Sequence, residues 1–323
     1  MVNQRNWGIG LGLAAVVLGG CAVQDRGEVS EVALDPAERP QVVATSGVLC
    51  DLARQIAEDT ITLTCLLAPG QDPHTYQARP SDRQAVDTAD LVLYEGYDFA
   101  PSVLNVVVSS RNPAPKVAVL EAAVPNPLMG QGHDHDHSHD HDHEHEANEH
   151  IWFDFALTLD AANHIVEAIV ELRPEAKEST TKSLSVFEDE LGDLEGRVES
   201  LREDALGLGF IATEGVANLM LLNAGFQNLT PDALSDAVEE ERDVPLDALE
   251  EAKALLENKV AAILVVNITT TDVATDQLIA AAESGNRQVV RVSEAASGAN
   301  SNEVDDYLSW MNHVIDQLMQ AIE

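Results

Sequence analysis

Seven histidines alternate with other residues between Gly132 and Ala147, and every residue between them except one serine is Asp or Glu. The histidines are His133, His135, His137, His139, His141, His143 and His145. Imidazole has an unperturbed pKa of about 6.5, so much of this tract is neutral near pH 7 and able to coordinate a cation that the acids attract. The tract has no apolar residue with which to build a core. It therefore predicts an accessory loop, 133–145, that binds several metal ions loosely; an acidic, solvated linker is the alternative.

Two histidines outside this loop lie where the chain would hold them in place. His74 follows a turn fixed by two prolines and a glycine in the segment 69–76. His150 precedes three apolar residues, 151–153, that would pack against the fold, and Asp154 beyond them could accept a hydrogen bond from an imidazole ring N–H. Taken alone, a histidine in a loop is more often a hydrogen-bonded surface residue than a metal ligand.

Two glutamates follow apolar runs that read as strands. Glu214 comes after a run that ends at Thr213, and it is expected in the first turn of the next helix. Glu294 comes after a run that ends at Val292. Open α/β sheets place their ligand sites at the carboxyl ends of strands. An acid at a helix N-terminus is also favoured by the helix dipole, which is the alternative explanation for both residues.

The N-terminus indicates export. Arg5 precedes an apolar run at 9–18 that is too short to span a bilayer comfortably, and the run leads into Leu18-Gly19-Gly20-Cys21. This arrangement resembles a bacterial lipoprotein signal, which implies a signal peptide at 1–20 and lipidation of Cys21. A plain cleaved secretory signal is the alternative. Residues 21–40 are polar and acidic, as in a flexible tether.

Removing Cys21 from the count leaves Cys50 and Cys65. In an exported protein an even number of cysteines is consistent with a disulfide, and two buried thiols in neighbouring elements are the alternative. Sequence alone does not give the separation of their Cα atoms, which decides between the two.

The formal net charge of −38 limits the partners of the chain. Such acidity excludes nonspecific binding to nucleic acid and argues against adhesion to anionic lipid through a basic patch. Contact with the membrane is therefore expected through the lipid anchor only, and the soluble part is expected to be a monomer.

The chain from residue 40 onward alternates short apolar runs with longer amphipathic ones, a pattern typical of a parallel sheet flanked by helices. The first set of segments is 41–45, 49–57, 61–67, 81–86, 90–94 and 116–120. The pattern restarts with 209–213, 217–223, 246–256, 260–266, 274–283, 288–292 and a final helix at 304–322. The prediction is an α/β fold of two lobes, 41–173 and 206–323.

The stretch 174–205 between the lobes carries apolar residues at spacings of three and four, which predicts one long amphipathic helix. Pro174 is expected in its first turn, and the helix would run about 40 Å at 1.5 Å per residue. Such a connector resists hinge closure, so the lobes should move only slightly around a metal site in the cleft between them. Tyr307 and Trp310 are expected to pack the last helix onto the second lobe.

Three motifs resemble a known family. The segment 69–94, with Asp72-Pro73-His74-Thr75-Tyr76, looks like the first ligand region of the zinc- and manganese-binding lipoproteins that feed bacterial ABC importers. His150 matches that family's Asn-x-His-x-Trp segment after a variable loop, which is often His-rich in zinc-specific members. The resemblance runs from about residue 41 to the C-terminus and implies that His74 and His150 are metal ligands.

The resemblance also implies a role for the two glutamates. Glu214 stands in Ala212-Thr213-Glu214-Gly215, which is similar to the form found in many manganese binders, whereas zinc binders carry His there. The fourth ligand in the family is usually Asp, and this chain offers Glu294. The implied ligand set is therefore His74, His150, Glu214 and Glu294.

The expected function is an extracytoplasmic, lipid-anchored receptor that captures Zn²⁺ and delivers it to the permease and ATPase of an ABC importer. Intrinsic affinity and the His-rich loop favour zinc, and Glu214 favours manganese as the alternative metal. A surface metal buffer or adhesin without an importer is a further alternative. Catalytic zinc sites keep an open position for water, and no His-Glu-x-x-His helix occurs, so an enzyme is not expected.

Overall fold

The structure is a computed structural model of the chain and describes residues 38–57, 59–68, 70–97, 99–125, 148–239, 242–270, 272–296 and 306–323. These residues belong to one compact unit. The predicted signal peptide, Cys21, nearly all of the tether and the loop 133–145 lie outside the described residues. Among the helices that are described, none is both long enough and apolar enough to cross a membrane.

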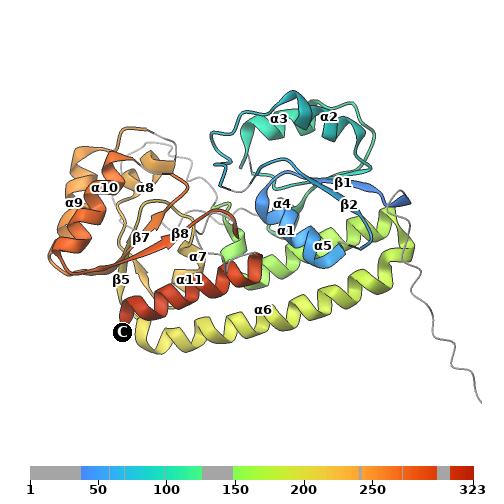
Figure 1. Cartoon of the computed structure of the whole chain (residues 1–323). Helices are drawn as coiled ribbons and strands as arrows, with labels where there is room; N and C mark the ends of the chain where they lie inside the picture. The colour runs from blue at the N-terminus through green and yellow to red at the C-terminus, as the bar shows by residue number, and fades with distance from the viewer. Residues whose placement is uncertain are drawn as a thin grey trace, which may run out of the picture. The chain divides into compact units, whose positions relative to one another are not determined.

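The first lobe is built on a parallel sheet of four short strands. Its strands are β1 (Gln41–Ala44), β2 (Thr62–Cys65), β3 (Leu91–Tyr94) and β4 (Lys116–Ala118), in the order β2-β1-β3-β4. The helices that follow the strands are α1 (Gly47–Ala57), α2 (Pro80–Thr88), α3 (Pro101–Ser109) and α4 (Val119–Ala123). In Figure 1, α2 and α3 lie on one side of the sheet and α1 on the other. The β1 residues Val42 and Val43 are buried between these layers, as a two-faced parallel sheet requires.

The second lobe repeats this topology. Its strands are β5 (Gly209–Ala212), β6 (Gln227–Asn228), β7 (Ala261–Asn267) and β8 (Gln288–Val292), all parallel and in the order β6-β5-β7-β8. Its helices are α7 (Asn218–Asn223), α8 (Asp232–Glu239), α9 (Leu246–Glu257), α10 (Val273–Ser284) and α11 (Tyr307–Ile322). The prediction of two α/β lobes with parallel sheets is confirmed, although β6 and α8 were not predicted.

The connection between the sheets contains two long helices. The 3₁₀ turn η2 (Ile151–Phe153) leads into α5 (Phe155–Leu172), and a second turn, η3 (Pro174–Ala176), leads into α6 (Lys177–Ala205). The predicted apolar stripe of α6 is buried at Phe187, Leu191, Leu194, Val198 and Leu201. Pro174 begins the 3₁₀ turn η3, which runs directly into α6, so it opens the long helical stretch as predicted. With 29 residues, α6 is about 43 Å long, and it contacts α1 and α5 as well as α7 (Figure 1).

The last helix, α11, connects the two lobes a second time, contrary to the expectation that Tyr307 and Trp310 pack onto the second lobe. Tyr307 donates a hydrogen bond from its hydroxyl to the backbone oxygen of Trp152 (2.7 Å). Trp310 meets Phe153 edge to face, with ring centroids 5.4 Å apart. These two aromatic side chains lie three positions apart on one helix face, and both are 1% exposed. Further along α11, Gln317 exchanges two hydrogen bonds of 3.0 Å with the backbone of Arg291 in β8.

The structure joins Cys50 and Cys65 in a disulfide, with Cα atoms 5.8 Å apart. Of the two alternatives that the sequence left open, the structure therefore contains the disulfide. It fixes the start of α1 to the end of β2, where the loop that carries His74 begins.

Candidate metal site

The four predicted ligands come from four segments that follow strands or precede a helical turn. His74 lies in the loop between β2 and α2, and His150 immediately precedes η2. Glu214 follows β5 and Glu294 follows β8. All but His150 therefore lie beyond the carboxyl end of a strand, where open α/β sheets bind ligands.

The loop that carries His74 is held by its own polar side chains. The Asp72 carboxylate accepts hydrogen bonds from the backbone N–H of His74 (2.8 Å) and from the Thr75 hydroxyl (3.0 Å). The Tyr76 hydroxyl donates to Asp82 in α2 (2.8 Å). Because both ends of the turn are tied, the imidazole of His74 is held in place before any ion arrives.

His150 is almost fully buried, with 1% of its surface exposed. Its ring lies edge to face with Phe99 and Trp152, at centroid distances of 6.1 and 5.2 Å. The side-chain oxygen of Asn148 lies 3.2 Å from His150 Nδ1 and also accepts the backbone N–H of His150 (3.0 Å). A proton on Nδ1 donated to this oxygen leaves the lone pair of Nε2 for a metal.

The hydrogen-bond acceptor beside the His150 ring is Asn148, and not Asp154 as predicted. Asp154 instead caps α5 by accepting the backbone N–H of Leu157 (3.1 Å), and it accepts a hydrogen bond from the Asn223 side chain (3.0 Å). The first turn of α5 provides unpaired N–H groups that an acid at this position satisfies, which explains the difference.

Neither glutamate lies in the first turn of a helix, which corrects that expectation. The helix after β5 begins only at Asn218, and Glu294 lies in a bend. Both are buried, at 3% and 4% exposure. The Asn267 side-chain amide at the end of β7 donates to Glu214 Oε2 (2.7 Å) and to Glu294 Oε1 (2.8 Å). Asn267 was not predicted from the sequence. It is a polar residue at the end of the apolar strand β7, which lies between β5 and β8, and this position was a usable signal.

Each of the four predicted ligands has one buried atom with no hydrogen-bond partner. These atoms are His74 Nε2, His150 Nε2, Glu214 Oε1 and Glu294 Oε2. A buried polar atom without a partner costs on the order of 1–3 kcal/mol. Two nitrogen and two oxygen lone pairs left in this way are the donor set that a divalent transition metal ion would satisfy.

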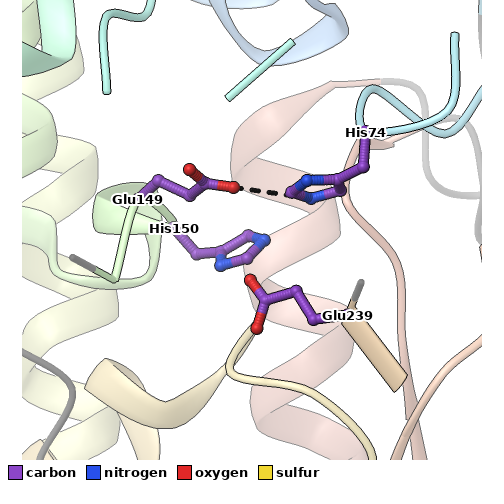
Figure 2. Close-up of side chains that lie close together, drawn as sticks. All are labelled: His74, Glu149, His150 and Glu239. Atoms are coloured by element: carbon purple, nitrogen blue, oxygen red, sulfur yellow. Dashed lines mark ion pairs between the residues drawn. The ribbon is translucent and has the colours of Figure 1, made fainter. Parts of the chain in front are cut away.

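The structure also brings two unanticipated carboxylates to the histidines. Glu149, His150, His74 and Glu239 can each offer a ligand atom, and these atoms all lie within 4.8 Å of one another (Figure 2). His74 Nε2 is 3.5 Å from Glu149 Oε1 and 3.8 Å from Glu294 Oε2.

A second grouping with the same spacing contains Asp72, His74 and Glu294, and Glu214 belongs to neither grouping. Glu149 could have been suspected as the neighbour of His150. Glu239 could not, because it ends a helix, α8, that the sequence analysis did not predict.

Burial sets the protonation of these groups. It lowers the pKa of His150 to about 3, with a smaller contribution from the neighbouring His74. Burial also lowers the pKa of His74, against the opposing effect of Asp72. Burial raises the pKa of Glu214 to about 7, and burial together with the nearby Glu214 raises the pKa of Glu294 well above its usual value. Without a metal, the imidazole of His150 is neutral and Glu214 is partly protonated near pH 7, so binding of a cation to Glu214 would release protons.

The two lobes approach one another closely beside Glu294. A Cβ atom added to Gly47, at the start of α1, would lie 2.9 Å from the Cβ of Ala295. The cavity here has a volume of about 20 Å³ and is lined by residues of both lobes, among them Ser46, Phe99 and Thr269. It has room for about one water molecule or one ion.

The sequence profile of the family described as ZnuA, "Zinc-uptake complex component A periplasmic", matches residues 42–321. The manganese-binding lipoprotein MntA of Bacillus subtilis is 27% identical over 178 residues, which cover 55% of this chain and 53% of MntA. The manganese ABC transporter substrate-binding lipoprotein scaA of Streptococcus gordonii is 26% identical over 189 residues, covering 57% of this chain and 56% of scaA. These alignments thus span about half the length of the two relatives.

The fold is also similar to that of a solved structure. The periplasmic zinc-binding protein TroA of Treponema pallidum superimposes with a TM-score of 0.73 at 21% identity, over 88% of this chain and 99% of TroA. At this identity the likeness shows the fold alone. Because the family match extends from the first strand to the last helix, the chain belongs to the ZnuA family of metal ABC transporter substrate-binding proteins.

Proposed function

We propose that this protein is an extracytoplasmic receptor that binds one Zn²⁺ ion with His74, His150, Glu214 and Glu294 and delivers it to the permease and ATPase of an ABC importer. The observation that carries the proposal is the set of four buried, unpartnered donor atoms, one on each of these side chains. Two imidazoles and two carboxylates suit a four-coordinate zinc ion. Four protein ligands leave no position for a reacting water, which supports binding and transport and not catalysis.

The hydrogen bonds of Asn267 suit binding of an ion through one oxygen of each glutamate. Each carboxylate accepts from the Asn267 amide through one oxygen, and its other oxygen has no hydrogen-bond partner. Manganese would need both oxygens of each carboxylate to reach a higher coordination number. For the same ligands, intrinsic affinity also favours zinc. Mn²⁺ stays the alternative cargo, since relatives are named for either metal.

The rest of the chain has roles that fit such a receptor. Cys21 would carry the lipid that anchors the protein to the membrane, and residues 21–40 would hold the lobes 41–173 and 206–323 away from it, with 174–205 between them. The loop 133–145 would raise the local concentration of metal as an accessory to the site. The folded part acts as a monomer with no nucleic-acid partner. A surface metal buffer without an importer is the second candidate, because the loop alone would suffice for buffering.

Calorimetric titration with Zn²⁺ and Mn²⁺ tests the proposal on the soluble protein that begins at Val23, with and without residues 133–145. The expected result is one tight zinc site that survives loop deletion and is lost in His74→Ala. His164→Ala is the matched control, because His164 lies on α5 beside Glu167 and away from the site. Loss of all zinc binding with the loop would favour the buffer, and tight manganese with weak zinc would favour the alternative metal.

A further inference from the structure

The imidazole of His74 lies near one member of each of two different pairs of carboxylates. Glu214 and Glu294 form the inner pair, joined by Asn267. Glu149 and Glu239 form the outer pair, and Figure 2 shows their carboxylates converging with the rings of His74 and His150. From His74 Nε2 the distance to the outer pair (3.5 Å, Glu149) is similar to that to the inner pair (3.8 Å, Glu294).

The two pairs differ in their exposure to solvent. The inner glutamates are 3% and 4% exposed, whereas Glu149 is 9% exposed and Glu239 is partly exposed. His74, which contacts both pairs, has a side chain that is 20% exposed. His150 is almost fully buried, and its Nε2 has no hydrogen-bond partner. The outer pair is therefore nearer to solvent than the inner pair, and it lies close to the imidazoles of His74 and His150.

We propose that His74, His150, Glu149 and Glu239 form an entry site for a divalent cation, from which the ion moves to Glu214 and Glu294 while the imidazoles remain bound. This inference rests on the proposed function of the inner site. Because the imidazoles are shared, one ion occupies either the outer or the inner position at a time.

A two-position route lowers the barrier to dehydration. A cation that entered the buried site directly would lose its waters before it reached the carboxylates, and desolvating an ion costs several kcal/mol. At the outer position, Glu149 and Glu239 replace some of these waters while solvent is still near. The ion then exchanges one carboxylate oxygen for another, with no stage at which it lacks ligands.

The test is the kinetics of Zn²⁺ binding in the full chain, followed by stopped-flow tryptophan fluorescence. Trp152 reports on the site because its ring lies 5.2 Å from that of His150. In Glu149→Gln/Glu239→Gln, the rate constants of binding and of release are expected to fall together by about tenfold or more, because focused charge raises association rates by this order. The dissociation constant should change much less, since a route alters both directions equally. Glu239→Gln alone should give a smaller decrease.

The matched control is Glu251→Gln/Glu257→Gln, which removes the same charge from exposed positions of α9. In contrast, Glu214→Gln/Glu294→Gln should accelerate release and weaken the equilibrium affinity. The inference is overturned if the outer variant binds at the rate of the native protein, or if its affinity falls through faster release alone. If the native protein gives no saturable zinc signal, or if the signal survives His74→Ala/His150→Ala, the proposed function itself fails.

Discussion

Asn267 organises the second lobe's half of the site with a single amide group. Its two N–H bonds point to one oxygen of Glu214 and one of Glu294, and its own oxygen accepts the backbone N–H of Thr269 (3.0 Å). The amide is 1% exposed and has few ways to turn without losing one of these bonds. It therefore decides which oxygen of each carboxylate remains for an ion.

Replacing Asn267 with Ala should weaken zinc binding by about 10–100-fold, the range typical of residues that orient metal ligands. Without the amide, both carboxylates turn more freely and lose a donor that favours their charged form. Calorimetry measures the affinity, and circular dichroism checks that the variant folds. Asn258→Ala is the control, since Asn258 bonds only within its own helix end in α9. Native affinity in Asn267→Ala would contradict this role.

Glu214 should make the stability of the metal-free protein fall as pH rises. Its pKa is about 7 in the folded state, against an ordinary value of 4.5, so the folded state retains a proton that the unfolded state releases between these pH values. The stabilisation is fully present below pH 4.5 and is lost as pH rises through about 7, a change on the order of 3 kcal/mol.

Urea unfolding with a chelator, at pH 5 and pH 8, measures this effect. Native protein should lose more unfolding free energy between the two pH values than Glu214→Gln, which does not titrate there. His150 titrates in both proteins, whereas the variant also loses the Glu214 charge that helps to raise the pKa of Glu294, so the difference reports the two coupled carboxyls together. A native-minus-variant difference that is the same at both pH values would argue against the raised pKa.

Among the elements, the ones predicted from sequence are those with a strong apolar pattern. The apolar runs of β1, β3, β5 and β7 and the stripe of α6 indicate their structures directly, because burial requires those residues. The two-residue strand β6 is too short to show a period, and its position follows from tertiary packing. Helix α8 does carry a helical period, with Leu234, Ala237 and Val238 buried, and this signal was overlooked.

The candidate site could be proposed only in part from the sequence. His74, His150, Glu214 and Glu294 were predicted from motifs and stay predictions as ligands, whereas Asn267 and Glu239 reach the site only through the order of strands in the sheet and the packing of α8. The local setting of Glu214 was misjudged because the chain makes a bend before α7, and composition alone does not show where that helix begins.

Removing the disulfide should cost stability without removing the metal site. Cys50 and Cys65 close a loop with a sequence separation of 15, for which loop-closure entropy gives about 3 kcal/mol. His74 is held by Asp72 and by the contact of Tyr76 with Asp82, and these are independent of the bridge. Cys50→Ala/Cys65→Ala should therefore unfold at lower urea and bind zinc with near-native affinity. Native protein under reducing conditions is the control. A double variant as stable as the oxidised native protein would contradict the disulfide.

For the whole molecule, α6 and α11 together limit the movement of the lobes. Tyr307 fixes the start of α11 to Trp152 next to His150, and Gln317 fixes a later turn to β8. Small-angle X-ray scattering should therefore give radii of gyration that differ by less than about 1 Å between the zinc-loaded and chelator-treated protein. Tyr307→Phe, which removes the hydrogen bonds of the Tyr307 hydroxyl to Trp152 and to Thr158, provides a comparison. A large compaction on zinc binding would show a hinge that these helices do not prevent.

The burial of the candidate ligands would also limit the form in which a metal could be taken up. His150, Glu214 and Glu294 are at most 4% exposed, so an ion with an organic chelator around it would not reach all of them. The net charge of −38 repels anionic chelates as well. Under the proposed function, citrate or peptide complexes would therefore have to release their metal first, and the protein would compete with its surroundings for the free ion.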